Sequence, residues 1–140
     1  MQELRTEAKV ENLEKVLDFL NGQLESLECP MKTQMQIDVA LEELYVNIAN
    51  YAYAPGTGDA VIQFDSDAES RCVTIILTDS GTPFDPLAKS DPDVSLPAEK
   101  RRIGGLGIYM AKKNMDDMQY RRENGKNILT LRKSLVPKPR

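Results

Sequence analysis

The stretch "TQMQIDVALEELYVNIANYAY" (residues 33–53) predicts a long helix, and the fold class follows from how the rest of the chain is arranged around it. Its apolar residues recur every three or four positions, which is the spacing of a helix that buries one face. The main apolar face consists of Ile37, Leu41, Leu44, Ile48 and Ala52, and it is extended by Val39, Ala40, Val46 and Ala49. A helix that is apolar around most of its circumference is predicted to lie mostly buried.

A polar stripe interrupts this helix. Glu43, Asn47 and Asn50 are spaced i, i+4 and i+7, so they share one narrow face, whereas Glu42 falls on a different face. Polar side chains in apolar surroundings need partners, because unpaired buried polar groups are costly. Hydrogen bonds to neighbouring backbone or to each other would satisfy them. A ligand would also satisfy them, since Mg²⁺ prefers carboxylate and amide oxygens and is commonly shared with substrate phosphates. Taken alone, the helix favours the structural interpretation.

The segments on either side of this helix predict the remaining elements. A short strand is expected at residues 2–8. The helix after it has an apolar face made of Val10, Leu13, Leu17, Leu20, Leu24 and Leu27. Further strands are predicted at 60–65 and 72–79, then a helix at 106–114 and a closing hairpin at 118–124 and 127–133. Segregated helices and hairpins favour an α+β fold, a two-layer sandwich with helices on one face of a mixed β-sheet.

The segment "DSGTPFDP" (residues 79–86) follows an apolar strand. Asp, Ser, Gly and Pro all favour a turn, so the segment is explained by a turn alone. It is also compatible with a binding site, in which Asp79 is a carboxylate held at a strand end and Gly81 leaves space beside it, although the segment alone does not distinguish the two. An acceptor in that position is suited to the exocyclic amine of a purine.

The segment "IGGLGIYMAKKNMD" (residues 103–116) places three glycines just where a helix is expected to begin. Glycine suits a position where a ligand approaches the main chain closely. A helix N-terminus presents unpaired N–H groups and a partial positive charge, which together favour a phosphate group. Gly104 and Gly105 are also compatible with a simple tight loop.

Composition narrows the class of protein. The 140 residues are enough for one domain, residues 1–140, with a frayed tail at 135–140. A formal net charge of −4 argues against direct nucleic-acid binding and against binding to an anionic membrane. The chain lacks an apolar run of membrane-spanning length and a secretory signal, so a cytoplasmic protein with two free thiols, Cys29 and Cys72, is expected. The absence of histidine excludes phosphohistidine chemistry within this chain.

The three motifs together are more specific than any one of them. A Glu-x-x-x-Asn on a helix, an Asp-x-Gly after a strand, a long loop and a Gly-x-Gly opening a helix follow in this order. This order resembles the GHKL ATPase family, and within it the short anti-sigma-factor serine/threonine kinases. "ALEELYVNIANYAY" is similar to the N box of that family, "DSGTPFDP" to its first glycine box and "GGLGIYMAKKNMD" to its second. The first box departs from the common Asp-x-Gly-x-Gly pattern because Pro83 takes the last glycine position.

The resemblance implies a role for each motif residue. Glu43 would be the general base that acts on the acceptor hydroxyl, and Asn47 would coordinate the Mg²⁺ that bridges the triphosphate of ATP. Asn50 would contact phosphate, Asp79 would accept from the adenine amine, and Gly81 would leave room for the ring. Residues 86–103 would form an ATP lid. The phosphates would be met by backbone or cationic groups of Lys100, Arg101, Arg102, Gly104, Gly105, Leu106 and Gly107.

The resemblance also implies a function. The chain would phosphorylate a serine or threonine of an anti-anti-sigma partner with a STAS domain, and it would sequester a sigma factor on another surface. A homodimer is compatible with the family. Two alternatives remain open: a nucleotide-dependent binding regulator without kinase activity, and a stand-alone histidine-kinase-like ATPase module acting on a histidine in another chain.

Overall fold

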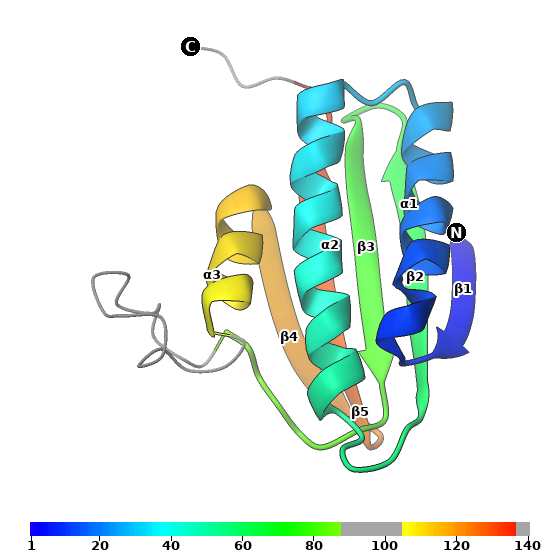
Figure 1. Cartoon of the computed structure of the whole chain (residues 1–140). Coiled ribbons are helices and arrows are strands. Elements are labelled where there is room, and N and C mark those ends of the chain that lie inside the picture. Colours follow the sequence, from blue (N-terminus) through cyan, green and yellow to red (C-terminus); the bar gives the residue numbers. More distant parts are fainter. Residues whose placement is uncertain (88–104, 137–140) are drawn as a thin grey trace.

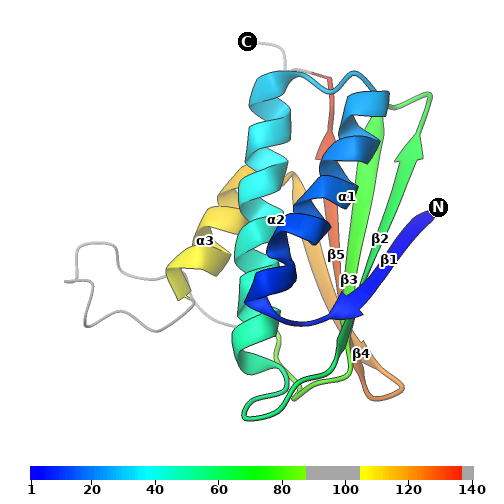
Figure 2. The same cartoon turned by 45° about the vertical axis from the view of Figure 1, so that its right-hand side comes forward.

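The helices of this protein cover one face of a five-stranded sheet, as Figures 1 and 2 show. The computed structural model describes residues 1–87 and 105–136. In chain order the elements are β1 (Gln2–Glu7), η1 (Val10–Asn12), α1 (Leu13–Ser26), α2 (Met31–Tyr51), β2 (Asp59–Asp67), β3 (Cys72–Asp79), α3 (Gly105–Asn114), β4 (Asp117–Glu123) and β5 (Lys126–Ser134). The predicted α+β two-layer arrangement and order of elements are confirmed.

The sheet itself corrects one expectation. Its strand order is β1-β2-β3-β5-β4, and every neighbouring pair is antiparallel. The sheet is therefore not mixed. β4 does run in the same direction as β3, but β5 lies between the two strands, so no parallel pair forms.

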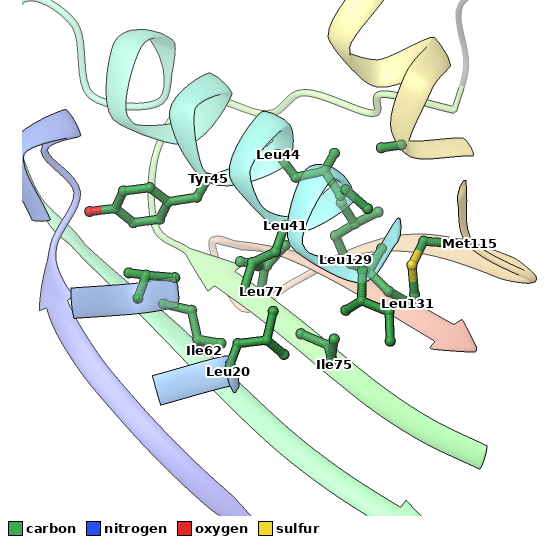
Figure 3. Close-up of a cluster of buried hydrophobic side chains, with 14 of the residues drawn as sticks. Leu20, Leu41, Leu44, Tyr45, Ile62, Ile75, Leu77, Met115, Leu129 and Leu131 are labelled. Carbon is green, nitrogen blue, oxygen red and sulfur yellow. The ribbon is translucent and has the colours of Figure 1, made fainter. Parts of the chain in front are cut away.

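The core lies between the helices and the inward face of the sheet (Figure 3). Alternate residues of β3 point inward, so Val73, Ile75 and Leu77 are buried while their neighbours are less so. These side chains meet Leu20 of α1 and Leu41 of α2 in one cluster. Burying one side chain of this size is worth about 1.5–3 kcal/mol. The two-layer packing is thus the main source of stability.

Helix α2 crosses the middle of the sheet and touches both other helices. Its predicted apolar face is buried through Ile37, Leu41, Leu44 and Ile48. Its first turns differ from the prediction of a mostly buried helix, because Met31 and Met35 are 73% and 60% exposed. The helix therefore begins in solvent and becomes enclosed toward its C-terminal half, where α3 packs beside it (Figure 1).

Tyr45 fastens α2 to the start of the chain. Its ring is fully buried, and burial raises the pKa of its hydroxyl group. The hydroxyl donates to the carbonyl of Lys9 at 2.8 Å and accepts from the Lys9 amide at 3.2 Å. These bonds hold the connection between β1 and α1. Val10 in that connection is 49% exposed, contrary to the prediction that it belongs to the buried face of the first helix.

Cys29 and Cys72 are free thiols, as expected from the sequence. Within residues 1–87 and 105–136, the structure has no helix long and apolar enough to cross a membrane.

Candidate functional site

A cavity of about 220 Å³ opens where the C-terminal half of α2 meets the ends of β3 and β5. Its walls are mainly apolar, and several of them are aromatic or proline rings. The lining residues are Leu44, Asn47, Ile48, Tyr51, Ala52, Leu77, Asp79, Thr82, Pro83, Phe84, Pro86, Tyr120, Asn127 and Leu129. A mostly apolar cavity with a few convergent polar groups is the usual form of a small-molecule site.

Asp79 supplies the acceptor at one end of this cavity. It is the last residue of β3, and the inward alternation of that strand turns its side chain toward the core side, where it is only 6% exposed. One carboxylate oxygen, Oδ1, accepts hydrogen bonds from the Gly81 amide at 2.9 Å and from the Asn127 side chain at 2.9 Å. Among the described residues, no donor contacts the second oxygen, Oδ2. The carboxylate can therefore accept one more hydrogen bond.

The turn after Asp79 is hydrogen-bonded to the residue that follows α2. The Thr82 amide donates to the carbonyl of Ala52 at 2.9 Å. A side chain at Gly81 would lie 2.6 Å from the carbonyl carbon of Ala52, so only glycine allows this approach. The direction that a Gly81 side chain would take is thus occupied by Ala52 after α2, and the role of Gly81 beside the ring of a ligand stays a prediction.

Tyr53 makes a second hydrogen bond to the same turn. Its hydroxyl accepts from the Ser80 amide at 2.7 Å and donates to the carbonyl of Asp59 at 2.6 Å. A side chain at Gly58 would lie 2.6 Å from Cδ1 of the tyrosine ring, so Gly58 makes room for it. The carboxylate of Asp79 is consequently carried on a turn whose position relative to α2 is well defined.

Glu43 and Asn47 lie at the other end of the arrangement. Asn47 lines the cavity, and Glu43 lies one helical turn before it, about 6 Å away along α2. The carboxylate of Glu43 lies directly against Gly107 near the N-terminus of α3, because a methyl group at Gly107 would overlap its Oε2 atom. Neither side chain is hydrogen-bonded to another described residue. The structural interpretation of the stripe, in which these groups satisfy each other or nearby backbone, is therefore not seen within the described residues.

The other predicted site residues either do not line the cavity, lie at the start of α3, or fall outside the described residues. Asn50 is exposed and does not line the cavity. Gly105 is the first residue of α3, followed by Leu106, so the predicted start of this helix differs by one position. Lys100, Arg101, Arg102 and Gly104, together with most of the expected lid at 86–103, lie outside the described residues.

Comparison with known proteins identifies the family. The family model of the histidine kinase-like ATPase domain matches residues 6–133 of the chain. The chain belongs to this family. The match includes all the described residues of the site, from Glu43 on α2 to Asn127 on β5.

Two groups of relatives carry kinase names. Serine-protein kinase RsbW of Bacillus cereus (strain AH820) is 34% identical over 95 residues, which cover 65% of this chain and 58% of the relative. The chain therefore spans less than two thirds of that relative. Serine/threonine-protein kinase BtrW of Bordetella bronchiseptica (strain ATCC BAA-588 / NCTC 13252 / RB50) is 26% identical over 106 residues, which cover 76% of this chain and 74% of the relative.

Solved structures share the fold of this histidine kinase-like ATPase domain. The RsbU and RsbW domains of Rv1364c from Mycobacterium tuberculosis superpose with a TM-score of 0.65 at 16% identity, covering 96% of this chain and 32% of that one. The histidine kinase domain of the blue-light activated histidine kinase from Erythrobacter litoralis EL346 gives a TM-score of 0.50 at 16% identity, covering 76% and 46%.

Among the residues of the site that the sequence analysis missed, Asn127 is the one whose side chain bonds directly to Asp79. Asn127 is 7% exposed and lies directly opposite Asp79 in the pairing of β3 with β5. Its position in β5 was a usable signal, because it shares the inward face with Leu129 and Leu131. A polar residue at an inward strand position needs a partner. What the sequence does not indicate is which partner that is.

The described residues also fit a magnesium ion held mainly by a ligand. They contain no group of three or more Asp, Glu, His or Cys side chains able to hold a metal ion by themselves. Mg²⁺ in nucleotide enzymes is normally bound through one or two protein oxygens plus substrate phosphates. Asn47 lines the cavity without a side-chain hydrogen-bond partner among the described residues, and its amide oxygen suits that mode of binding.

Proposed function

We propose that this protein is a serine/threonine protein kinase of the anti-sigma-factor type, which binds ATP with Mg²⁺ in the cavity between α2, β3 and β5. The observation that carries the proposal is the joint position of three side chains. Asn47 and Asp79 line one cavity, and Glu43 lies one turn from Asn47 against the start of α3. The kinase names of two groups of relatives support the same assignment.

In this proposal the base of the nucleotide occupies the apolar part of the cavity. Oδ2 of Asp79 accepts a hydrogen bond from the exocyclic amine of adenine. The phosphates extend toward α3, where Gly105, Leu106 and Gly107 offer backbone N–H groups and the partial positive charge of a helix N-terminus. Asn50 and the cationic residues Lys100 and Arg101 stay candidate phosphate contacts, as predicted from the sequence.

Asn47 would hold the magnesium ion through its amide oxygen. The ion, when bound with the nucleotide, supplies neutralisation of charge on the triphosphate. The cavity beside Asn47 is lined mainly by apolar side chains, and electrostatic interactions are stronger in such surroundings than in bulk water.

Glu43 would act on the acceptor hydroxyl. The oxygen of a serine or threonine on the partner forms a bond to the γ-phosphorus, the bond from that phosphorus to the β–γ bridging oxygen breaks, and ADP leaves. The proton of the hydroxyl passes to the carboxylate of Glu43. Positioned general bases typically contribute about 10²–10⁴-fold to the rate.

The partners follow from the resemblance of the motifs. The acceptor would be an anti-anti-sigma protein with a STAS domain, and a sigma factor would be the protein that is held and released. Nucleotide state and phosphorylation of the STAS partner would then decide which of the two proteins is bound.

Two measurements test this proposal. Thermal unfolding with ATP, ADP and Mg²⁺ tests nucleotide binding, and a rise in melting temperature is expected. Transfer of labelled phosphate from ATP to a STAS-domain protein tests the kinase activity. Melting that is unchanged by every nucleotide would contradict the whole assignment, whereas binding without transfer would leave a nucleotide-dependent regulator.

Two matched variants sharpen the transfer assay. Glu43→Ala is expected to reduce transfer at least about a hundredfold while nucleotide binding persists. Glu42→Ala removes the neighbouring carboxylate, which is exposed on another face of α2, and should leave transfer unchanged. Equal losses in the two variants would remove Glu43 from the catalytic role.

A further inference from the structure

Asn127 uses its entire hydrogen-bonding capacity inside the protein. Its side-chain nitrogen donates to Oδ1 of Asp79 and to the carbonyl of Thr82, both at 2.9 Å. Its side-chain oxygen accepts from the Tyr120 hydroxyl at 2.6 Å and from the Phe84 amide at 3.3 Å. An asparagine side chain offers two donor hydrogens and an acceptor oxygen with two lone pairs, so none of this capacity is left over.

These partners also determine which way the amide points. The backbone N–H of Phe84 can only donate, so the oxygen of Asn127 must face it. The carbonyl of Thr82 can only accept, so the nitrogen must face that side, toward Asp79. Rotating the amide by half a turn would break both bonds. Asn127 therefore always presents a donor to Asp79.

This orientation controls what the cavity offers to a ligand. Oδ1 of Asp79 is occupied by the Asn127 nitrogen and the Gly81 amide, which leaves Oδ2 as the accepting atom. The donors of Asn127 are already used, and so is the hydroxyl hydrogen of Tyr120. Among the side chains of Asp79, Tyr120 and Asn127, the polar end of the cavity therefore offers an acceptor and no free donor, while the Thr82 hydroxyl, which also lines the cavity, can donate or accept. A ligand group that donates is favoured there, and a carbonyl oxygen would face a carboxylate.

We infer that Asn127 is a positioning residue that gives this cavity its selectivity for a purine with an amino group over one with an oxo group. It acts through Asp79 and does not itself touch the base. The inference rests on the proposed function, because it assumes that a nucleotide base occupies this cavity.

The test compares binding of ATP, ITP and inorganic tripolyphosphate, measured by calorimetry. Adenine and hypoxanthine differ at C6, where an oxo group replaces the amine, and at N1, which gains a hydrogen, so the ratio of the ATP and ITP affinities reports on the polar end of the cavity around Asp79. The wild-type protein is expected to prefer ATP by about tenfold or more, as for a hydrogen bond to a charged group. Asn127→Asp keeps the size and the accepting oxygen but loses both amide donors, and its carboxyl lies beside that of Asp79, so the pair shares a proton that can be donated to the oxo group of ITP. It should reduce the preference to about twofold or less while tripolyphosphate binds as before.

Matched variants control for charge and folding. Asn124→Asp makes the same change of charge in the exposed β4–β5 turn, where φ is 52° and Asp is tolerated, and it should keep the wild-type ratio. In an Asp79→Asn background, Asn127→Asp should cause no further change in the ratio. If circular dichroism shows that Asn127→Asp is unfolded, Tyr120→Phe is used instead. It removes the hydrogen bond that the Tyr120 hydroxyl donates to Asn127 and should reduce the ratio of the ATP and ITP affinities about threefold.

The outcomes separate this inference from the proposed function. A wild-type protein that binds no nucleotide would contradict the proposed function. A wild-type protein that binds ATP and ITP equally, or a folded Asn127→Asp variant with the wild-type ratio, would overturn the positioning role of Asn127 and leave nucleotide binding intact. A parallel loss of affinity for ATP, ITP and tripolyphosphate would mean that Asn127 only supports the fold.

Discussion

The substitution Gly107→Ala tests whether phosphate transfer depends on the position of the Glu43 carboxylate. It should move this carboxylate without lowering the stability of the fold. A Cβ atom at residue 107 would lie 3.3 Å from Cδ of Glu43 and would overlap its Oε2 atom. The end of a glutamate side chain is flexible, so the carboxylate can withdraw by about 1 Å without moving the backbone. The substitution therefore displaces the proposed general base while keeping the N–H group of residue 107.

The expected magnitudes differ sharply between activity and stability. A misplacement of about 1 Å in a catalytic group costs about a hundredfold in rate, which corresponds to about 2.7 kcal/mol in the activation barrier. Alanine is also a better helix former than glycine by about 1 kcal/mol, which offsets the cost of moving Glu43. Phosphate transfer should thus fall about a hundredfold, with a melting temperature close to that of the wild-type protein and an unchanged affinity for ATP.

The assay is transfer of labelled phosphate from ATP to a STAS-domain protein, with two comparisons. Gly22→Ala makes the same change in α1, where a Cβ meets nothing within 4 Å, and should leave transfer unchanged. In a Glu43→Ala background, Gly107→Ala should have no further effect on the rate, because the overlapping carboxylate is gone. A wild-type rate in Gly107→Ala, or an additive loss in the double variant, would refute the reasoning.

Three further predictions concern stability. Gly81→Ala should lower the free energy of unfolding by about 1–3 kcal/mol in urea titrations, because its Cβ would be 2.6 Å from a backbone atom of Ala52 that cannot give way. Tyr53→Phe removes the hydrogen bonds to Ser80 and Asp59 and should lower the free energy of unfolding by about 1–2 kcal/mol in the same titrations. A much smaller decrease would mean that water replaces the tyrosine hydroxyl at both partners. Burial raises the pKa of Asp38 above 3.8, so its charged form destabilises the fold at neutral pH. The Asp38→Asn variant should therefore have a higher melting temperature than the wild-type protein at pH 7. This difference in melting temperature should vanish as the pH falls below 3.8, where the wild-type carboxyl is protonated in both the folded and the unfolded protein. A difference that persists at low pH would contradict burial of the charged carboxylate as the cause.

Local patterns were sufficient to predict the elements of this protein. The repeat of apolar residues in α2 and the alternation in β3 depend only on which face of each element is buried. These patterns placed Glu43 and Asn47 on one face of a helix and Asp79 at the end of a strand. Asn127 was not predicted as part of the site, because its partner Asp79 lies 48 residues away in the sequence.

The sequence by itself determined the helices and strands, their order, and the three motifs that carry the family resemblance, because each depends on residues close together in the chain. Only the tertiary structure decided that β5 lies between β3 and β4, that Asn127 holds Asp79, and that Gly81 and Gly107 make room for Ala52 and Glu43. The physical reason is that strand order and close packing depend on which surfaces fit together across the whole domain. The pattern of residues close together in the chain does not indicate which distant surfaces fit together.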